Sequence, residues 1–381
     1  MSGLSVEPKI ASRPVVTSKL MLLAAWSTAA VVLGLLAVSV VRHLRAPATT
    51  MSMALYRQGA APSGPLMGSN LVTAWHLDVA AVGFLTLLAT LYLTGMVMAL
   101  RRGTRWPLAR AASFFAGLAV IAYATCGGIA VYDMALFSAH MIGHLLLIMI
   151  APAFLVSGRP LRLAITASRP KTGRRLQAVL RSRPIALLTS PPVTLATYAV
   201  VIVGTHLTGF MNTVMRNAAF GQLEHLMYLV AGFQFFLLIL GDEPIRWQLG
   251  IPLRWLFLAL AMAVDTFTGI VLLQQSYPMA MMRAPGLHVD ALDDTHTGGA
   301  IMWVGGDGIM VLFMVALVVM WLRLSERDRR GTLSWLEEAR RAHFASHAVA
   351  APSDPESDLD EDDEQWAAYN AYLQSINGPR R

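Results

Sequence analysis

Eight apolar stretches, each long enough to cross a lipid bilayer, constrain this chain more than any other feature of its sequence. A transmembrane α-helix needs about 20 consecutive, mainly apolar residues. The stretches cover about residues 20–41, 77–100, 111–131, 138–156, 185–205, 223–241, 253–274 and 300–322. Hydrophobic residues make up 55% of the chain and charged residues 14%, so a water-soluble domain could not cover its apolar surface. The sequence therefore predicts an all-α integral membrane protein, a bundle of about eight transmembrane helices.

The basic residues predict how this bundle is oriented. If the N-terminus is cytoplasmic, the inner segments carry 25 of the 30 Lys and Arg residues. The outer segments then hold only five: Arg42, Arg45, Arg57, Arg216 and Arg283. Because positive residues collect on the inner side of membranes, we expect both termini in the cytoplasm. The net charge of +7 therefore indicates orientation and gives no reason to expect nucleic-acid binding.

Four regions follow from this pattern. Residues 1–19 are expected to be a cytoplasmic N-terminus, and 20–322 the helical bundle, with its first stretch as an uncleaved signal anchor. Residues 323–347 predict a charged cytoplasmic helix, and 348–381 a largely disordered tail, since 353–364 hold eight acids in twelve residues. The sequence shows no phosphate-binding glycine loop and no nucleophile elbow, so we do not expect an enzyme.

The histidines are concentrated at the outer ends of the expected spans. The clearest pair is His140 and His144, which a separation of four residues places on one face of the fourth span. Neutral imidazole binds copper, zinc and iron, so this pair is a candidate metal site. Four more candidate ligands lie at a similar depth: His76, His206, His225 and His296. A single histidine at a membrane interface also serves as an amphipathic anchor, and that alternative stays open for each.

Methionine and cysteine extend the list of soft ligands only a little. Met279, Met281 and Met282 form the densest cluster of the 21 methionines and lie in an outer loop. Thioethers favour Cu(I), although methionine also fills gaps in apolar helices. Cys126 is the only cysteine, which excludes an intrachain disulfide and a thiolate-only metal site. Copper is therefore one candidate metal for this ligand set, beside zinc and iron.

Four carboxylates lie where the apolar environment makes a charge costly or where histidines are near. Glu224 precedes His225, and Asp294 lies close to His296. Asp265 and Asp307 lie within the seventh and eighth spans, and ionisable residues at such depth are functional candidates. The alternative for these two is a structural hydrogen bond to a neighbouring helix, and both interpretations stay open.

Three segments together resemble a known family. They are His140-Met-Ile-Gly-His144 followed by Ala151-Pro152 and Gly158-Arg-Pro160, then Gln222-Leu-Glu224-His225, and then Asp294 with Gly298, Gly299, Met302 and Trp303. The pattern resembles the multi-spanning cytochrome c oxidase assembly factor family called CtaG, over about residues 70–322. The first span and the acidic tail lie outside the resemblance. This chain also lacks the further histidine expected shortly before Glu224, and has Thr295 and His296 where a glutamine pair is expected.

The resemblance implies a role in maturing the haem-copper oxidase at its copper centres, with His140, His144, His225 and Asp294 as functional positions. We therefore expect a copper-binding, chaperone-like assembly factor in a bacterial plasma membrane. Its expected partners are the lipid bilayer, cytochrome c oxidase subunits and a possible copper donor protein. A copper transporter and a b-type haem membrane protein remain the alternatives.

Overall fold

The computed structural model describes residue 66 and residues 68–241, 243–279, 281 and 287–346. Of residue 218 and residues 327–346, only the backbone is described. Every regular element in these ranges is a helix, which confirms the predicted all-α class. The expected N-terminus (1–19), the first expected span (20–41) and the acidic tail (348–381) lie outside the described residues.

Within the described residues the helices follow the chain in seventeen segments. They are α3 (Asn70–Thr73), α4 (Val79–Arg101), α5 (Leu108–Cys126), α6 (Gly128–Tyr132), α7 (Phe137–Leu145), the π-helical turn η2 (Leu146–Ile150), α8 (Ala151–Ser157), α9 (Pro160–Ala167), α10 (Pro170–Leu180), α11 (Arg183–Leu188), α12 (Pro191–His206), α13 (Phe210–Arg216), α14 (Ala218–Leu240), α15 (Ile251–Leu273), α16 (Ala291–Ala300), the π-helical turn η3 (Ile301–Gly305) and α17 (Gly306–Ser346).

Six helical stretches among the described residues are long and apolar enough to cross a membrane: Val79–Arg101, Leu108–Tyr132, Phe137–Ala167, Ala219–Leu240, Ile251–Leu273 and Ala291–Glu326. A seventh candidate joins α12 and α13, which are bent by 67° at the break between them. The expected fifth span, 185–205, is interrupted near its start. Helix α11 ends at Leu188, and Pro191 and Pro192 begin the new helix α12. The count of eight and the cytoplasmic termini stay predictions.

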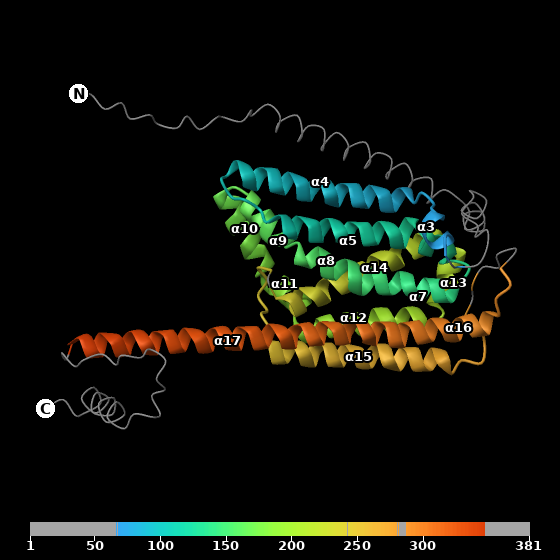
Figure 1. Ribbon diagram of the computed structural model, residues 1–381. Helices are drawn as coiled ribbons and strands as arrows, with labels where there is room; N and C mark the ends of the chain where they lie inside the picture. Colours follow the sequence, from blue (N-terminus) through green and yellow to red (C-terminus); the bar gives the residue numbers. More distant parts are fainter. Residues whose placement is uncertain (1–65, 67, 242, 280, 282–286, 347–381) are drawn as a thin grey trace, which may run out of the picture. The chain divides into compact units, whose positions relative to one another are not determined.

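The bundle, up to Leu317, is built from neighbouring helices that lie side by side (Figure 1). Helix α5 packs between α4 and α8, α14 packs on α8 and α12, and α15 packs on α12 and α16. The closest approach is at Gly232 of α14, where an added Cβ would lie 2.7 Å from the backbone carbon of Ile148 and from Pro152 Cγ. Glycine at this position lets α14 contact the backbone of η2 directly.

Polar caps fix where the long helices begin. The Asp78 carboxylate accepts hydrogen bonds from the N–H groups of Ala80 and Ala81 at the start of α4. Helix α14 begins with Asn217, whose side chain accepts from Ala219, and ends at Gly241 in the left-handed conformation (φ 63°). These caps fix the N-terminal ends of α4 and α14.

The outward faces of the bundle helices remain strongly apolar. Large side chains such as Leu91, Val230, Leu260, Phe267 and Leu312 are each more than a third exposed. A water-soluble protein would not leave so many large apolar side chains uncovered along its helices. The apolar faces are those expected where lipid surrounds the helices.

Residues beyond Leu317 form a second unit. Within it the backbone of α17 continues as helix to Ser346. Residues 323–346 of the expected charged helix (323–347) fall in this stretch, and residue 347 lies outside the described residues.

Candidate metal centre

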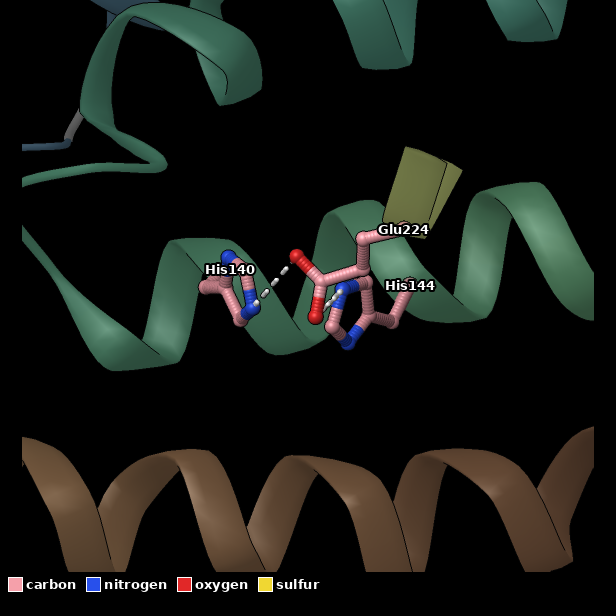
Figure 2. A group of neighbouring side chains, drawn as sticks. All are labelled: His140, His144 and Glu224. Atoms are coloured by element: carbon pink, nitrogen blue, oxygen red, sulfur yellow. Dashed lines mark ion pairs between the residues drawn. The ribbon is translucent and has the colours of Figure 1, made fainter. Parts of the chain in front are cut away.

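Three buried side chains converge from two helices. His140 and His144 lie one turn apart on α7, and Glu224 reaches them from α14 (Figure 2). Glu224 Oε2 lies 3.8 Å from His140 Nε2, and Glu224 Oε1 lies 3.7 Å from His144 Nε2. One ligand atom from each residue lies within 4.8 Å of the other two. All three residues are buried. Two imidazoles and a carboxylate at this spacing can bind a transition-metal ion.

The carboxylate of Asp294, on α16, positions the helix that carries both histidines. It accepts hydrogen bonds from the backbone N–H of Phe137 at 2.6 Å and from the hydroxyl of Ser138 at 2.5 Å. These groups form the first turn of α7, whose own N-cap residue, Leu136, provides no side-chain cap. A negative group at a helix N-terminus is favourable. Asp294 therefore acts here as a cap supplied by another helix, and it holds α7 in place.

Several polar atoms at the centre have no hydrogen-bond partner. They are His144 Nε2 and both carboxylate oxygens of Glu224, and all are buried. Leaving such atoms unpaired away from water costs free energy. A cation between Glu224 and the two imidazoles would satisfy all of them, so the geometry fits a metal ion.

Asp133 orients His140 from the opposite side. Asp133 Oδ1 lies 2.6 Å from His140 Nδ1, so this nitrogen carries the proton that the carboxylate accepts. Burial alone would raise the pKa of Asp133, but the imidazole of His140 outweighs it and holds that pKa below its ordinary value. With Nδ1 bound to Asp133, Nε2 is the ring nitrogen of His140 that faces Glu224, at 3.8 Å. Such carboxylate–histidine pairs are the usual support of metal-binding histidines.

A chain of hydrogen bonds orients His144 in the same way. His206 Nδ1 lies 2.8 Å from the carbonyl of Ile202 and therefore donates to it. His206 Nε2 must then accept from His144 Nδ1, which lies 3.3 Å away. Thr205 and Tyr228 complete this network with a hydroxyl contact of 2.6 Å. The result is that His144 Nε2 carries no proton and faces Glu224 at 3.7 Å. The tautomers follow from the hydrogen-bond partners.

Two further predicted ligands, His225 and His76, lie outside this group of three. His225 Nε2 lies 4.0 Å from Asp133 Oδ2, and the His225 side chain is 21% exposed. His76 is partly buried just before α4. Burial lowers the pKa of His76 below its ordinary value, so the imidazole is neutral at pH 7.

The remaining predicted ligands are not brought to the centre. His296 Nε2 bonds to the carbonyl of Gln275 at 2.9 Å. Met279 and Met281 pack against the hydrophobic core, and Met282 lies outside the described residues. Other methionines are closer, because Met141, Met149 and Met302 line a cavity of about 10 Å³ next to His144 and His206. A cavity of this size holds about one water molecule.

The two intramembrane aspartates bind neighbouring helices. Asp265, on α15, accepts from the hydroxyl of Tyr198 on α12, with O–O distances of 3.0 and 2.9 Å. Asp307, on α17, accepts from Thr266 on α15 at 2.7 Å. Each therefore makes the interhelical hydrogen bond that the sequence offered as the structural alternative.

Sequence reasoning missed Asp133, although a signal for it exists. It is the only acidic residue between Asp78 and Glu224, and it follows the outer end of the expected span 111–131. An isolated carboxylate at the depth of six candidate histidines is a reason to test it as their partner.

Comparison with known proteins shows which family model and which relatives match this chain. The family model described as "Cytochrome c oxidase caa3 assembly factor" matches residues 90–324, which include every residue of the buried centre. Similar proteins, each described only as uncharacterized, occur in Mycobacterium bovis and Mycobacterium tuberculosis (28% identical over 326 residues, 82% of this chain and 46% of the relative). Another, from Mycobacterium leprae, is 26% identical over 326 residues. The match covers 81% of this chain and 45% of the Mycobacterium leprae protein. The chain thus spans about half the length of these relatives. No solved structure matches it.

Proposed function

The chain belongs to the cytochrome c oxidase caa3 assembly factor family, and from this premise we propose that it binds a copper ion at His140, His144 and Glu224 and delivers it to the oxidase. In this proposal the protein lies in the plasma membrane of a bacterium. Its partners are oxidase subunits and a copper donor, and it carries out no catalysis of its own.

The observation that carries the proposal is the convergence of three potential metal ligands, of which the two histidines are oriented by hydrogen bonds at their Nδ1 atoms. His140 Nε2 and His144 Nε2 both face the Glu224 carboxylate at less than 4 Å. Imidazole donors suit copper, and Cu(II) forms the most stable complexes of the divalent first-row ions. Copper is the cargo expected of a factor that serves a haem-copper oxidase.

The ligand number supports transfer rather than storage. Three protein ligands leave a coordination position open, as in metal sites that exchange a ligand during their function. A ligand from the acceptor protein can bind at this position before the three protein ligands release the ion. The separate copper-transport alternative would require a continued polar path, and the deeper candidates, Asp265 and Asp307, are hydrogen-bonded to Tyr198 and Thr266.

The haem alternative is less favoured by the same contacts. His144 and His206 come from different helices, as axial haem ligands do, but their nitrogens are 3.3 Å apart in a direct hydrogen bond. The adjoining cavity of about 10 Å³ is far smaller than a porphyrin.

The proposal is tested in cells whose own copy of the gene is replaced by variants. We expect His140→Ala and His144→Ala each to reduce the amount of active oxidase while the abundance of this protein stays normal. Loss of one ligand lowers copper binding, whereas the rest of the helix packing is unchanged. His296→Ala is the matched control, since that imidazole lies away from the centre. Normal oxidase activity in a His140→Ala/His144→Ala strain with normal protein abundance would contradict the proposal.

A further inference from the structure

Helices α9 and α10 and the loop that follows α14 enclose an open pocket of about 400 Å³. It lies at the end of the bundle that carries α10, whereas α7 with its histidines lies toward the other end (Figure 1). The polar residues that line it are Arg162, Thr166, Gln177, Arg181, Glu243 and Gln248. Pockets that bind small ligands usually measure about 300–1,000 Å³. This pocket is therefore large enough for a small polar group.

Hydrogen bonds join the walls of this pocket to one another. Both carboxylate oxygens of Glu243 accept from backbone N–H groups in the first turn of α9, at 3.1 and 2.9 Å. The side-chain amide of Gln248 donates to the carbonyl of Glu243 at 3.0 Å. Trp247, in the same loop, donates to the carbonyl of Ala186 in α11 at 2.6 Å. The loop is thus fixed to α9 and to α11, and the pocket is a built part of the fold.

Two guanidinium groups give the pocket positive charge. Arg162 lies on α9 and Arg181 directly follows α10, and both residues are exposed. Within the described residues, no hydrogen bond or ion pair occupies either guanidinium group. A guanidinium group presents several N–H donors in a planar fork that matches the oxygens of a phosphate. The two arginines are therefore available to an anionic ligand.

The acidic residue in the wall, Glu243, opposes an anion only weakly. It is 1% exposed, and its oxygens are directed to the N–H groups of α9. Burial raises the pKa of Glu243 to about 7, so part of the population carries no charge at neutral pH. The surrounding chain is strongly basic, because residues 159–183 contain eight Lys and Arg and no Asp or Glu. The net field at the pocket therefore attracts anions.

The pocket lies where two candidate membrane spans end. Gly241 in its lining directly follows the stretch Ala219–Leu240, and Arg162 lies in the last turns of Phe137–Ala167. The ends of transmembrane helices lie at the depth of the lipid headgroups. A phosphate that reaches this pocket from the membrane is therefore already at the correct depth.

Exposed apolar side chains accompany the basic ones on the same short elements. Val179 on α10 and Leu187 and Leu188 on α11 are each more than half exposed, and Trp247 is 39% exposed. Short helices that combine basic and exposed apolar residues are typical of the membrane interface, and tryptophan is enriched there. These side chains favour a lipid over a free anion, since they can contact its acyl chains.

We propose that this pocket binds the phosphate-bearing headgroup of an anionic phospholipid, held by Arg162 and Arg181. The side-chain amide of Gln177 is a further donor to the headgroup, and the acyl chains lie along the apolar faces of the adjoining spans. The bound lipid joins α9, α10 and the loop after α14 at the membrane surface. If the predicted orientation is correct, this surface is the cytoplasmic leaflet, where anionic lipids attract basic segments. The inference does not depend on copper binding.

The test measures lipid binding to purified full-length protein in a neutral detergent. Phosphatidylglycerol is titrated in, and native mass spectrometry gives the fraction of protein that carries one lipid. We expect Arg162→Gln/Arg181→Gln to weaken binding of this lipid by about 25-fold, since each basic residue near an anionic lipid contributes about a fivefold change in affinity. Arg174→Gln/Arg175→Gln is the matched control. It removes the same charge from α10, but neither residue lines the pocket, so the affinity should stay close to wild type.

Several results would overturn the proposal. Equal weakening in the two double variants would show that surface charge alone attracts the lipid. Wild-type affinity in Arg162→Gln/Arg181→Gln would show that the pocket does not bind it. Phosphatidylcholine with the same acyl chains should bind more weakly, and equal binding would show that the anionic headgroup is not recognised. Inorganic phosphate bound as tightly as phosphatidylglycerol would assign the pocket to a free anion. If the double variant is not monodisperse, Arg181→Gln is compared with Arg175→Gln, and equal affinities of these two count against the pocket.

Discussion

At the scale of single residues, the buried centre depends on where two protons lie. Asp133 fixes one proton on His140 Nδ1, and the chain from His206 to Ile202 fixes the other on His144 Nδ1. Both Nε2 atoms therefore face Glu224 before an ion arrives. A site whose ligands are already oriented loses little conformational freedom on binding.

The first prediction concerns Asp133. Asp133→Asn keeps an oxygen that can accept from His140 but removes the negative charge that makes the imidazole more basic. We expect copper affinity to fall by about 10- to 100-fold, as for other second-layer carboxylates, with unchanged stoichiometry at saturating copper. Competition titration against a chelator of known affinity measures this. Unchanged affinity would show that Asp133 does not support the site.

The second prediction concerns Glu243, at the other end of the molecule. Its carboxylate accepts from the N–H groups of Leu161 and Arg162 at the start of α9. Burial nevertheless raises the pKa of Glu243 to about 7. The folded protein then binds more protons than the unfolded chain between the ordinary pKa and about 7, so stability falls as pH rises through this range.

Glu243→Gln should remove that dependence, because the amide keeps an acceptor oxygen and carries no charge. Thermal unfolding in detergent at about pH 5 and about pH 8 provides the comparison. We expect the melting temperature of wild type to fall toward pH 8 and that of the variant to change less. A variant clearly less stable than wild type at pH 8 would mean that the ionised carboxylate stabilises α9.

At the scale of helices, the centre depends on how closely α14 approaches α7 and its π-helical continuation. Gly232 allows this approach, because a Cβ there would meet the backbone of Ile148 and the ring of Pro152. A π-helical turn also follows α16, which caps α7 through Asp294. Such turns are frequent at functional sites, and both adjoin helices of this centre.

Gly232→Ala is therefore expected to destabilise the bundle by about 1–3 kcal/mol, the usual cost of overpacking. Gly308→Ala is the matched control, since a Cβ at Gly308 in α17 would meet no atom within 4 Å. Thermal unfolding in detergent should show a lower melting temperature for the first variant and no loss for the second. Equal stability of the two variants would contradict the close contact between α14 and η2.

Helical spacing was enough to predict that His140 and His144 lie on one helix face, but not which residues orient them. The interval between His140 and His144 places them on one face of any α-helix, and Glu224 begins a recognisable span. Asp133 reaches His140 only because the chain turns between α6 and α7, and periodicity does not describe that turn. Periodicity also does not predict that Met141, Met149 and Met302 meet near His144, because tertiary packing brings them together. A copper role for Met279, Met281 and Met282 stays a prediction.

At the scale of the whole molecule, the account requires the centre to lie on the outer side of the membrane. The charge distribution predicts that the segment after α15 is outside and the basic segment around α10 inside. In a Cys126→Ala background, Val289→Cys should react with a membrane-impermeant maleimide in intact cells. Thr172→Cys should react only after permeabilisation. Both positions are exposed, so burial does not limit the reaction. The reverse pattern would contradict the proposed orientation.

The most direct test of the central claim is the copper content of purified full-length protein after equilibration with copper and removal of loosely bound metal. We expect one retained ion per chain in wild type and in His296→Ala, and large losses in His140→Ala, His144→Ala and Glu224→Gln. Because the ligands act as a unit, the His140→Ala/His144→Ala variant should lose little more than the worse single variant. Copper retained equally by wild type and by this folded double variant would contradict the buried centre.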